Sequence, residues 1–488
     1  MNNTNAIRSK ILDLAIQGLL TKHLATDGTA EELYQEIQLK KIQLIRSGLI
    51  KREKELAPIS DDEIPFEIPE SWKWIRWGEI VNIVSARRVH QSDWRKSGVP
   101  FYRAREIAKL ADNGFVNNDL FISEELYKEF SSSGVPHEND LMVSAVGTLG
   151  KTYVVQKGER FYYKDASVLC FENFGNLNPY YLAYLMKSNM MRNQIENNSG
   201  GTTVDTITMI KMVKYVLPLP PLAEQQRIVE KIRQTFSILD TIDNLQSQYF
   251  NNQAVLKEKL IDAAIRGKLI EQLPEDGTAE ELYTQIQIER KRQEDSGKIK
   301  SVELLSGLSD SDEQLFEIPK NWKWTHLGNV SYIVRGGSPR PIKQYITTRK
   351  DGINWIKIGD VEKGGKYIFS TRDKIIPEGE SKSRRVYPGD FLLTNSMSFG
   401  RPYISKIEGC IHDGWLLIHG LNGFDPDYLY YLLSSTYMYD QFIDKASGST
   451  VDNLNIDKVK SAVIPLPPLA VQRRIAQKLD DLLISIEG

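Results

Sequence analysis

The feature that most constrains this chain of 488 residues is that it contains one sequence twice. Four segments recur in the same order, each 247 to 250 residues further along. The pairs are DGTAEELYQEIQ (27–38) with DGTAEELYTQIQ (276–287), FEIPESWKW (66–74) with FEIPKNWKW (316–324), NPYYLAYLMKS (178–188) with DPDYLYYLLSS (425–435), and LPLPPLAEQQRI (217–228) with IPLPPLAVQRRI (464–475). Four collinear matches indicate two copies of a module of about 245 residues. This period is too long for a solenoid and predicts two domains related by a pseudo-two-fold axis.

The composition is that of an ordinary globular protein, with 41% apolar and 26% charged residues. No run of 18 apolar residues predicts a membrane span, and the first 20 residues lack the pattern of a signal peptide. Two cysteines cannot form a disulfide framework, and no Cys/His cluster has zinc spacing. We therefore expect a cytoplasmic protein. Because the net charge is only −2, a site for a polyanion has to be sought locally.

The segment SAVGTLGKTYVV (144–155) resembles the end of a phosphate-binding loop. Such a loop requires G-x-x-x-x-G-K-[ST] between a strand and a helix, but Ala145 replaces the first glycine and the residues that follow favour a strand. In the second copy, Pro402 replaces the threonine. Both copies keep only a glycine followed by a basic residue, Lys151 or Arg401. These differences argue against a nucleotide-binding loop.

Comparison of the two copies also argues against a second apparent motif. The residues NPYY at 178–181 resemble the N-P-P-Y box of adenine methyltransferases, but the second copy reads DPDY at 425–428. Asn or Asp before Pro is typical of a helix N-cap followed by the first helical residue. No G-x-G-x-x-G follows a predicted strand either, so the sequence predicts no catalytic site.

The residues after PLPPLA predict a long helix from about Glu224 to Leu269. Apolar residues at heptad spacing indicate a coiled-coil seam, and the helix would span about 65 Å. The alternative is a long surface helix packed on its own domain. In the second copy this helix is split, because its first half ends the chain and its last part begins it. We therefore expect a circularly permuted repeat, neighbouring termini and antiparallel helices. The expected seam residues are Ile7, Ile11, Leu14, Ile228, Ile232, Leu239, Ile242, Leu256, Leu260, Ile475, Leu479, Leu482 and Ile486.

These features together resemble the specificity subunits of type I restriction–modification enzymes. The resemblance is carried by the duplicated LPLPPLAEQQRIVEKI segment before a long helix, the strand and glycine–basic loop at 140–151 and 390–401, and SGSTVDNL at 447–454. It covers essentially the whole chain. The chain departs from the family in the early end of its C-terminal helix and in one extra residue in SGGTTVDTI of the first copy.

The resemblance implies an α+β fold in which two long antiparallel coiled-coil helices separate two target recognition domains. The expected regions are 1–60 (conserved helical region), 61–220 (first recognition domain), 221–300 (spacer helices), 301–467 (second recognition domain) and 468–488 (C-terminal conserved helix). Each recognition domain would read one half of a bipartite, asymmetric DNA site.

The resemblance also implies partners. The helices would dock two methyltransferase (M) subunits that carry S-adenosylmethionine, and restriction (R) subunits with ATP and Mg²⁺ would join them. The chain itself would be non-catalytic and hold no cofactor. The alternatives are a stand-alone DNA methyltransferase or nuclease with an unrecognised active site, and a scaffold that binds only proteins.

Each predicted recognition domain has one basic stretch. Residues 86–109 contain seven Lys or Arg against two acidic residues, and residues 335–350 contain five against none. Such cations contact DNA phosphates, whereas Arg and Asn also read base edges. Asn395 and Ser396 replace Ala145 and Val146 of the first copy, which makes them candidates for base reading. The expected DNA-binding residues are Arg87, Arg88, Arg103, Arg105, Ser144, Thr148, Lys151, Thr202, Thr203, Arg335, Arg340, Lys357, Asn395, Ser396, Ser398, Arg401, Ser449 and Thr450.

Overall fold

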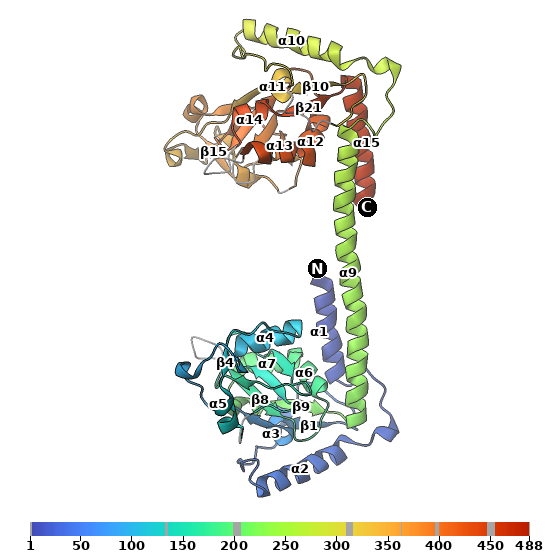
Figure 1. The fold of residues 1–488 in the computed structure, drawn as a ribbon, viewed down its shortest axis with the longest axis vertical. Coiled ribbons are helices and arrows are strands. Elements are labelled where there is room, and N and C mark those ends of the chain that lie inside the picture. The colour runs from blue at the N-terminus through green and yellow to red at the C-terminus, as the bar shows by residue number, and fades with distance from the viewer. Residues whose placement is uncertain are drawn as a thin grey trace. The chain divides into compact units, whose positions relative to one another are not determined.

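The computed structural model of the chain describes residues 2–131, 135–198, 206–308, 316–362, 364–395, 400–446 and 454–487. The chain forms two compact units, Met1–Ser247 (unit 1) and Gln248–Gly488 (unit 2). A helix of 44 residues, α9 (Leu222–Ile265), begins in unit 1 and ends in unit 2 (Figure 1). Within the described residues, no helix is long and apolar enough to cross a membrane.

Unit 1 combines two small sheets with helices. The larger sheet has the strand order β2-β8-β5-β6 and is antiparallel, whereas the smaller sheet has the order β4-β3-β7 and contains the parallel pair β3–β7. A separate antiparallel pair joins β1 to β9. Besides α9, the helices are α1 (Asn2–Ile16), α2 (Ala30–Arg46), α3 (Trp77–Ile80), α4 (Ala104–Asn113), α5 (Glu124–Phe130), α6 (Pro179–Lys187), α7 (Asn189–Asn198) and α8 (Met209–Met212). The strands are β1 (Lys73–Arg76), β2 (Asn82–Val84), β3 (Val99–Tyr102), β4 (Phe121–Ile122), β5 (Leu141–Ser144), β6 (Thr152–Val154), β7 (Tyr162–Tyr163), β8 (Val168–Glu172) and β9 (Val216–Leu219).

Unit 2 has the corresponding sheets, each with further strands. Their orders are β11-β20-β17-β18-β14 and β12-β15-β13-β19-β16, and the parallel pair of the second sheet is β13–β19. The helices are α10 (Ala279–Asp295), α11 (Leu327–Val330), α12 (Pro426–Ser434), α13 (Thr436–Ala446), α14 (Ile456–Lys460) and α15 (Leu469–Glu487). The strands are β10 (Lys323–His326), β11 (Tyr332–Arg335), β12 (Ile346–Thr347), β13 (Ile353–Ile356), β14 (Tyr367–Ile368), β15 (Asp373–Ile375), β16 (Arg384–Val386), β17 (Phe391–Thr394), β18 (Pro402–Ser405), β19 (Gly409–Ile411), β20 (Trp415–His419) and β21 (Val463–Leu466).

The two units therefore share one α+β topology, as the repeat predicts. They differ most between β3 and β5 of unit 1 and between β13 and β17 of unit 2. Unit 1 has the helices α4 and α5 and the strand β4 there, whereas unit 2 has β14, which pairs in parallel with β18, together with β15 and β16. The two modules thus share most helices and strands, and they differ in the elements inserted in this segment.

The predicted N-caps are confirmed. The Asn178 side chain accepts hydrogen bonds from the backbone N–H groups of the second and third residues of α6, at 3.0 and 3.3 Å. Asp425 does the same at the start of α12, with both distances 3.1 Å. A side-chain oxygen at this position satisfies N–H groups that have no partner within the helix. The N-P-Y-Y segment is a helix start.

The permuted repeat is confirmed within each unit. In unit 1, α1 packs antiparallel on the first part of α9, since Thr4 Oγ1 donates to Asp243 (2.8 Å) and Thr21 Oγ1 to Glu224 (3.1 Å). In unit 2, α15 packs antiparallel on the last part of α9 (Figure 1). The second helix of the expected antiparallel pair is divided, as the permuted repeat predicts. Its two parts are α1 in unit 1 and α15 in unit 2, and each packs on α9.

The predicted seam residues are buried at the start of α9 but not further along it. Ile228, Ile232 and Leu239 are buried, whereas Ile242 and Leu256 are 38% and 45% exposed. Leu260 is half-buried. In α15, the expected residues Ile475 and Leu479 are buried, and Leu482 and Ile486 are half-buried.

In α1 the seam is displaced from the predicted positions. The expected Ile7 is 45% exposed and Leu14 is half-buried, while Thr4 and Ile11 are buried. Arg8 faces α9, where its guanidinium lies 2.8 Å from Asp240 and 3.0 Å from Asp243. Two seam positions are therefore polar and held by hydrogen bonds, so apolar spacing alone assigns the wrong face.

The starts of α9 and α15 are each fixed to the rest of their unit by the glutamine of the PLPPLA segment. Gln225 is fully buried, accepts from the backbone N–H of Asn178 at 3.0 Å and donates to the carbonyl of Pro220 at 2.9 Å. Gln472 makes the equivalent bonds to Asp425 and Pro467. Two residues after each glutamine, an arginine pairs with an aspartate from a preceding loop.

We expect this arginine–aspartate pair to stabilise each unit. Arg227 donates to both carboxylate oxygens of Asp27, whose side chain is 4% exposed, and this hydrogen bonding lowers the pKa of Asp27. Arg227→Ala should lower the free energy of unfolding by about 1–3 kcal/mol, because a buried carboxylate loses its partner. Thermal unfolding at pH 7 would measure the loss, with exposed Lys231→Ala as the control.

The pH dependence follows from the sign of this shift. A carboxyl whose pKa is lowered on folding stabilises the native state above its unfolded pKa of about 3.9 and loses that contribution as the pH falls through the folded value. The difference between the wild type and Arg227→Ala should therefore shrink in strong acid. Equal melting temperatures for Arg227→Ala and Lys231→Ala at pH 7 would contradict the stabilising role.

Candidate nucleic-acid interface

The parallel strand pair of each unit brings two loops to one edge. Tyr102 of β3 is paired with Tyr163 of β7, and the backbone N–H of Lys164 donates to the Tyr102 carbonyl at 2.8 Å. In unit 2, Ile356 of β13 is paired with Ile411 of β19. Because parallel strands end at the same side of a sheet, the residues that follow them lie together. We call this side the carboxyl edge; it comprises 103–106 and 164–167 in unit 1, and 357–360 and 412–414 in unit 2.

Several predicted DNA-binding residues of unit 1 lie at its carboxyl edge. Arg103 and Arg105 both bond to the buried carboxylate of Glu106. Arg88, whose side chain is 74% exposed, lies 3.5 Å from Asp165. Arg87 is also exposed, and its guanidinium lies over the ring of Phe130 in α5, 5.6 Å from the centroid. Arg88, Arg103 and Arg105 thus lie at this edge, and each is paired with a carboxylate.

Three candidates of unit 2, Arg335, Arg340 and Asn395, contact Asp413 in the loop after β19. Its backbone carbonyl accepts from Arg335 Nε at 2.8 Å and from Asn395 Nδ2 at 3.0 Å. Its carboxylate accepts from Ser338 at 2.5 Å, which lowers the pKa of Asp413, and lies 3.4 Å from Arg340. Lys357 forms an ion pair with Asp373 at the neighbouring strand. Asp413 and Glu106 were not expected from the sequence; only the spacing of Glu106, three residues after Arg103, could have indicated its capping role.

Two candidates, Asn395 and Ser144, are buried and hydrogen-bonded within the fold. Asn395 is 1% exposed, and its backbone and side chain join three loops. Ser144 is fully buried, donates to the Thr148 carbonyl and accepts from the backbone N–H of Lys151 at 3.0 Å. Both polar groups shape the ends of buried strands, a role that composition and spacing cannot distinguish from base contact.

The geometry of the 144–151 loop also argues against nucleotide binding. The N–H groups of Gly150 and Lys151 both donate to Ser144, at 2.9 and 3.0 Å, so they are not directed at a ligand. Thr148 is exposed on this loop, and Thr152 begins the strand β6 as predicted. The remaining candidates, Thr202, Thr203, Ser396, Ser398, Ser449 and Thr450, lie outside the described residues.

Lys151 and Arg401 occupy equivalent positions in different electrostatic surroundings. Lys151 Nζ lies 2.5 Å from the carboxylate of Asp112 at the end of α4. Arg401 borders a cavity of about 600 Å³, and no Asp or Glu is among the described residues that line it. Three tyrosines and Lys257 line the same cavity; they are Tyr403, Tyr430 and Tyr439.

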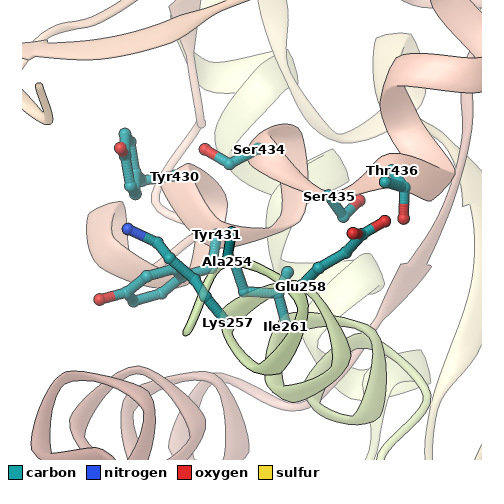
Figure 2. A pocket seen from close by; sticks show the side chains of 9 residues that line it. All are labelled: Ala254, Lys257, Glu258, Ile261, Tyr430, Tyr431, Ser434, Ser435 and Thr436. Atoms are coloured by element: carbon teal, nitrogen blue, oxygen red, sulfur yellow. The ribbon is translucent and has the colours of Figure 1, made fainter. Parts of the chain in front are cut away.

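A smaller cavity of about 220 Å³ shares part of this wall. Figure 2 shows Lys257 and Glu258 of α9 on one side of it, and Tyr430 and Ser434 of α12 on the other. Within the described residues, no three His, Cys, Asp or Glu side chains gather in a way that could hold a metal ion.

The sequence model of the type I restriction modification DNA specificity domain matches residues 69–248 and 319–487. The chain belongs to this family. The two matched segments correspond to the two copies of the module, so each copy is one specificity domain.

Relatives and solved structures agree with this membership. The chain is 24% identical to the EcoEI type I restriction enzyme specificity subunit of Escherichia coli over 546 residues, which cover 97% of this chain and 88% of the relative. It is also 24% identical to the Escherichia coli EcoAI specificity subunit, with 98% and 88% covered. The HsdS subunit from Thermoanaerobacter tengcongensis has the same fold (TM-score 0.53, 18% identity, 87% and 92% covered). A chain from a structural study of type I R-M complex assembly aligns with a TM-score of 0.59 (18% identity, 87% and 93% covered).

The unequal surroundings of the two basic residues lead to a prediction. Arg401→Ala should weaken binding to all DNA sequences and lower the salt dependence of binding by about one unit. Lys151→Ala should have a smaller effect of the same kind, because Asp112 already balances part of its charge. Fluorescence anisotropy on random duplexes at several salt concentrations would measure both slopes.

Asp112→Asn provides the internal test, since it should strengthen binding by releasing Lys151. Neither alanine variant should change nucleotide binding. If isolated wild type bound ATP and Lys151→Ala did not, the structural interpretation of this loop would be overturned.

Proposed function

We propose that this chain is the sequence-specific DNA-binding specificity subunit of a type I restriction–modification complex. The observation that carries the proposal is that both family matches contain the same carboxyl edge with basic residues. Each recognition domain would read one half of a bipartite, asymmetric site. Basic residues of the edge loops would contact the phosphates, and the elements that differ between the units, including α4, would meet the bases.

The division into conserved and variable elements supports this assignment. The helix pair, the buried glutamine and the capped helices α6 and α12 recur almost unchanged in both units. The segments after β3 and β13 differ in sequence and in secondary structure. A reader of two different half-sites needs such a constant frame with variable contact elements.

The helices would provide the docking surface for two methyltransferase subunits, one per copy. Exposed apolar side chains on α9 suit this role, because such residues are normally covered by a partner. They are Ile238, Ile242 and Leu245 in unit 1, and Tyr249, Phe250, Val255 and Leu256 in unit 2. Restriction subunits would join this core in the cytoplasm. S-adenosylmethionine, ATP and Mg²⁺ would bind to the partner subunits, and this chain would contribute no catalytic residue.

A stand-alone DNA methyltransferase or nuclease is the alternative. Isothermal titration of the isolated chain with S-adenosylmethionine distinguishes the two functions. A methyltransferase should show a heat of binding, whereas the proposed specificity subunit should show none. A scaffold that binds only proteins is the second alternative. Such a scaffold would not shift random DNA in a gel, with or without methyltransferase subunits.

The independence of the two recognition domains can be tested by exchange. Replacing residues 318–463 with a related domain should change one half of the recognised motif and leave the other half, read by residues 68–216, unchanged. The reason is that each unit has its own core, sheets and carboxyl edge. Mapping methylated adenines in cells that express the complex would reveal both halves. A folded, assembled exchange variant that changes both halves would refute separate reading.

The role of α9 as a spacer can be tested by insertion. Four residues added near Gln246 lengthen a helix by about 6 Å, which corresponds to nearly two base pairs. The gap between the half-sites should therefore change while both half-site sequences persist. Methylation mapping with the same complex provides the measurement, and an unchanged gap would show that α9 does not set the spacing.

A further inference from the structure

A buried carboxylate holds two guanidinium groups at the carboxyl edge of unit 1. Glu106 is 1% exposed and lies in the first turn of α4. One of its oxygens accepts from the backbone N–H and from Nε of Arg103, both at 3.0 Å. The other accepts from Nη2 of Arg103 at 3.0 Å and from Nε of Arg105 at 2.8 Å. Burial alone raises the pKa of Glu106, but these bonds outweigh it and lower the pKa to about 2, so the carboxylate is charged at neutral pH.

Unit 2 also has an arginine near a buried carboxylate at its carboxyl edge, but both residues differ from those of unit 1. After β13, Asp360 accepts from the backbone N–H of Lys357 at 3.0 Å, as Glu106 does from Arg103 after β3. The Asp360 side chain is 1% exposed, and Nε of Arg372 lies 3.5 Å from it. Arg372 precedes β15, whereas Arg105 lies in α4, so the cation comes from another element.

The strand pairing shows that one position of this edge carries opposite charges in the two units. Pro100 of β3 pairs with Phe121, and Asn354 of β13 pairs with Lys374. By this register, Arg372 of unit 2 occupies the place of Asp119 in unit 1. Asp119 lies 3.5 Å from Nη2 of Arg105. Both units thus hold a guanidinium near a buried carboxylate at this edge. In unit 1 the arginine comes from α4, and in unit 2 it comes from the residues before β15.

The way in which Arg105 is held determines what it can contact. Glu106 engages Nε, while the side chain is 57% exposed and its terminal nitrogens lie at the surface beside exposed Asp119. Two terminal guanidinium nitrogens match the O6 and N7 acceptors of guanine in the major groove, and lysine lacks this geometry. A side chain already held by a carboxylate loses less conformational freedom on binding.

We propose that Arg105 reads a guanine in the half-site of the first recognition domain, and that Glu106 is the positioning residue that orients it. The inference rests on the proposed function. Arg372 and Asp360 form the corresponding pair for the second half-site.

The test uses the full chain assembled with its methyltransferase subunits. The dissociation constant is measured on a panel of duplexes in which each base pair of the methylated motif is replaced in turn. Arg105→Lys keeps the charge but removes the fork of two nitrogens. It should lose about 10- to 100-fold discrimination at one G·C pair of one half-site and keep its affinity for random DNA. Glu106→Gln should weaken discrimination at the same pair by a smaller factor.

Arg160→Lys is the matched control, because Arg160 is also exposed and paired with a carboxylate, Glu124, but precedes β7 and so lies at the opposite end of the strand. It should leave the whole panel unchanged. Full discrimination by Arg105→Lys, or an equal loss on all duplexes, would identify Arg105 as a phosphate contact or a structural residue and overturn the inference. If the wild-type complex binds every duplex equally, the proposed function itself fails, and that outcome is visible before any variant is measured.

Discussion

The placement of each recognition domain depends on a glutamine that has no contact with solvent. Gln225 and Gln472 each bond to the backbone of the proline segment and to the start of the helix that follows the large sheet. An amide buried without these partners would destabilise the fold, so the start of the spacer helix and the recognition domain are held in one fixed relation. The adjoining arginine–aspartate pairs, Arg227–Asp27 and Arg474–Asp276, add the loop that precedes α2 or α10. These contacts therefore also fix the position of the basic loops at the carboxyl edge relative to α9 or α15.

The frame of the molecule could be predicted because it rests on patterns that repeat. The duplicated segments, the Asn178 and Asp425 caps and the first part of the α9 seam follow from local propensity and spacing. The seam of α1 could not be predicted, because Thr4 and Arg8 occupy positions that a heptad reserves for apolar residues and use Asp243 and Asp240 as partners. Hydrogen bonds across more than 200 residues leave no periodic signal.

The candidate interface was predictable as a region and not as a set of contacts. The basic stretches do reach the carboxyl edge, because parallel pairing collects the loops after β3 and β7, and after β13 and β19. Asn395 and Ser144 are buried and hydrogen-bonded within the fold, which their sequence does not indicate, since a polar residue after a buried strand can equally close a turn or face a ligand. Asp413, Glu106 and Arg372 were missed, because their importance arises from neighbours brought together only by the sheet. These carboxylates also help to explain how a protein with a net charge of −2 can present basic residues at its surface: Arg88, Arg105 and Lys357 each lie beside a carboxylate.

The helix pairing in unit 1 has a consequence for how the protein is made. Thr4 of α1 and Asp243 of α9, which hydrogen-bond to each other, are 239 residues apart in the chain. Ribosomes add about 5–20 residues per second, so α1 emerges on the order of ten to fifty seconds before its partner does. During that interval its apolar face, including Ile11, Leu12 and Ile16, has nothing from α9 to cover it. The nascent chain therefore carries this apolar segment without its α9 partner throughout synthesis of the first recognition domain.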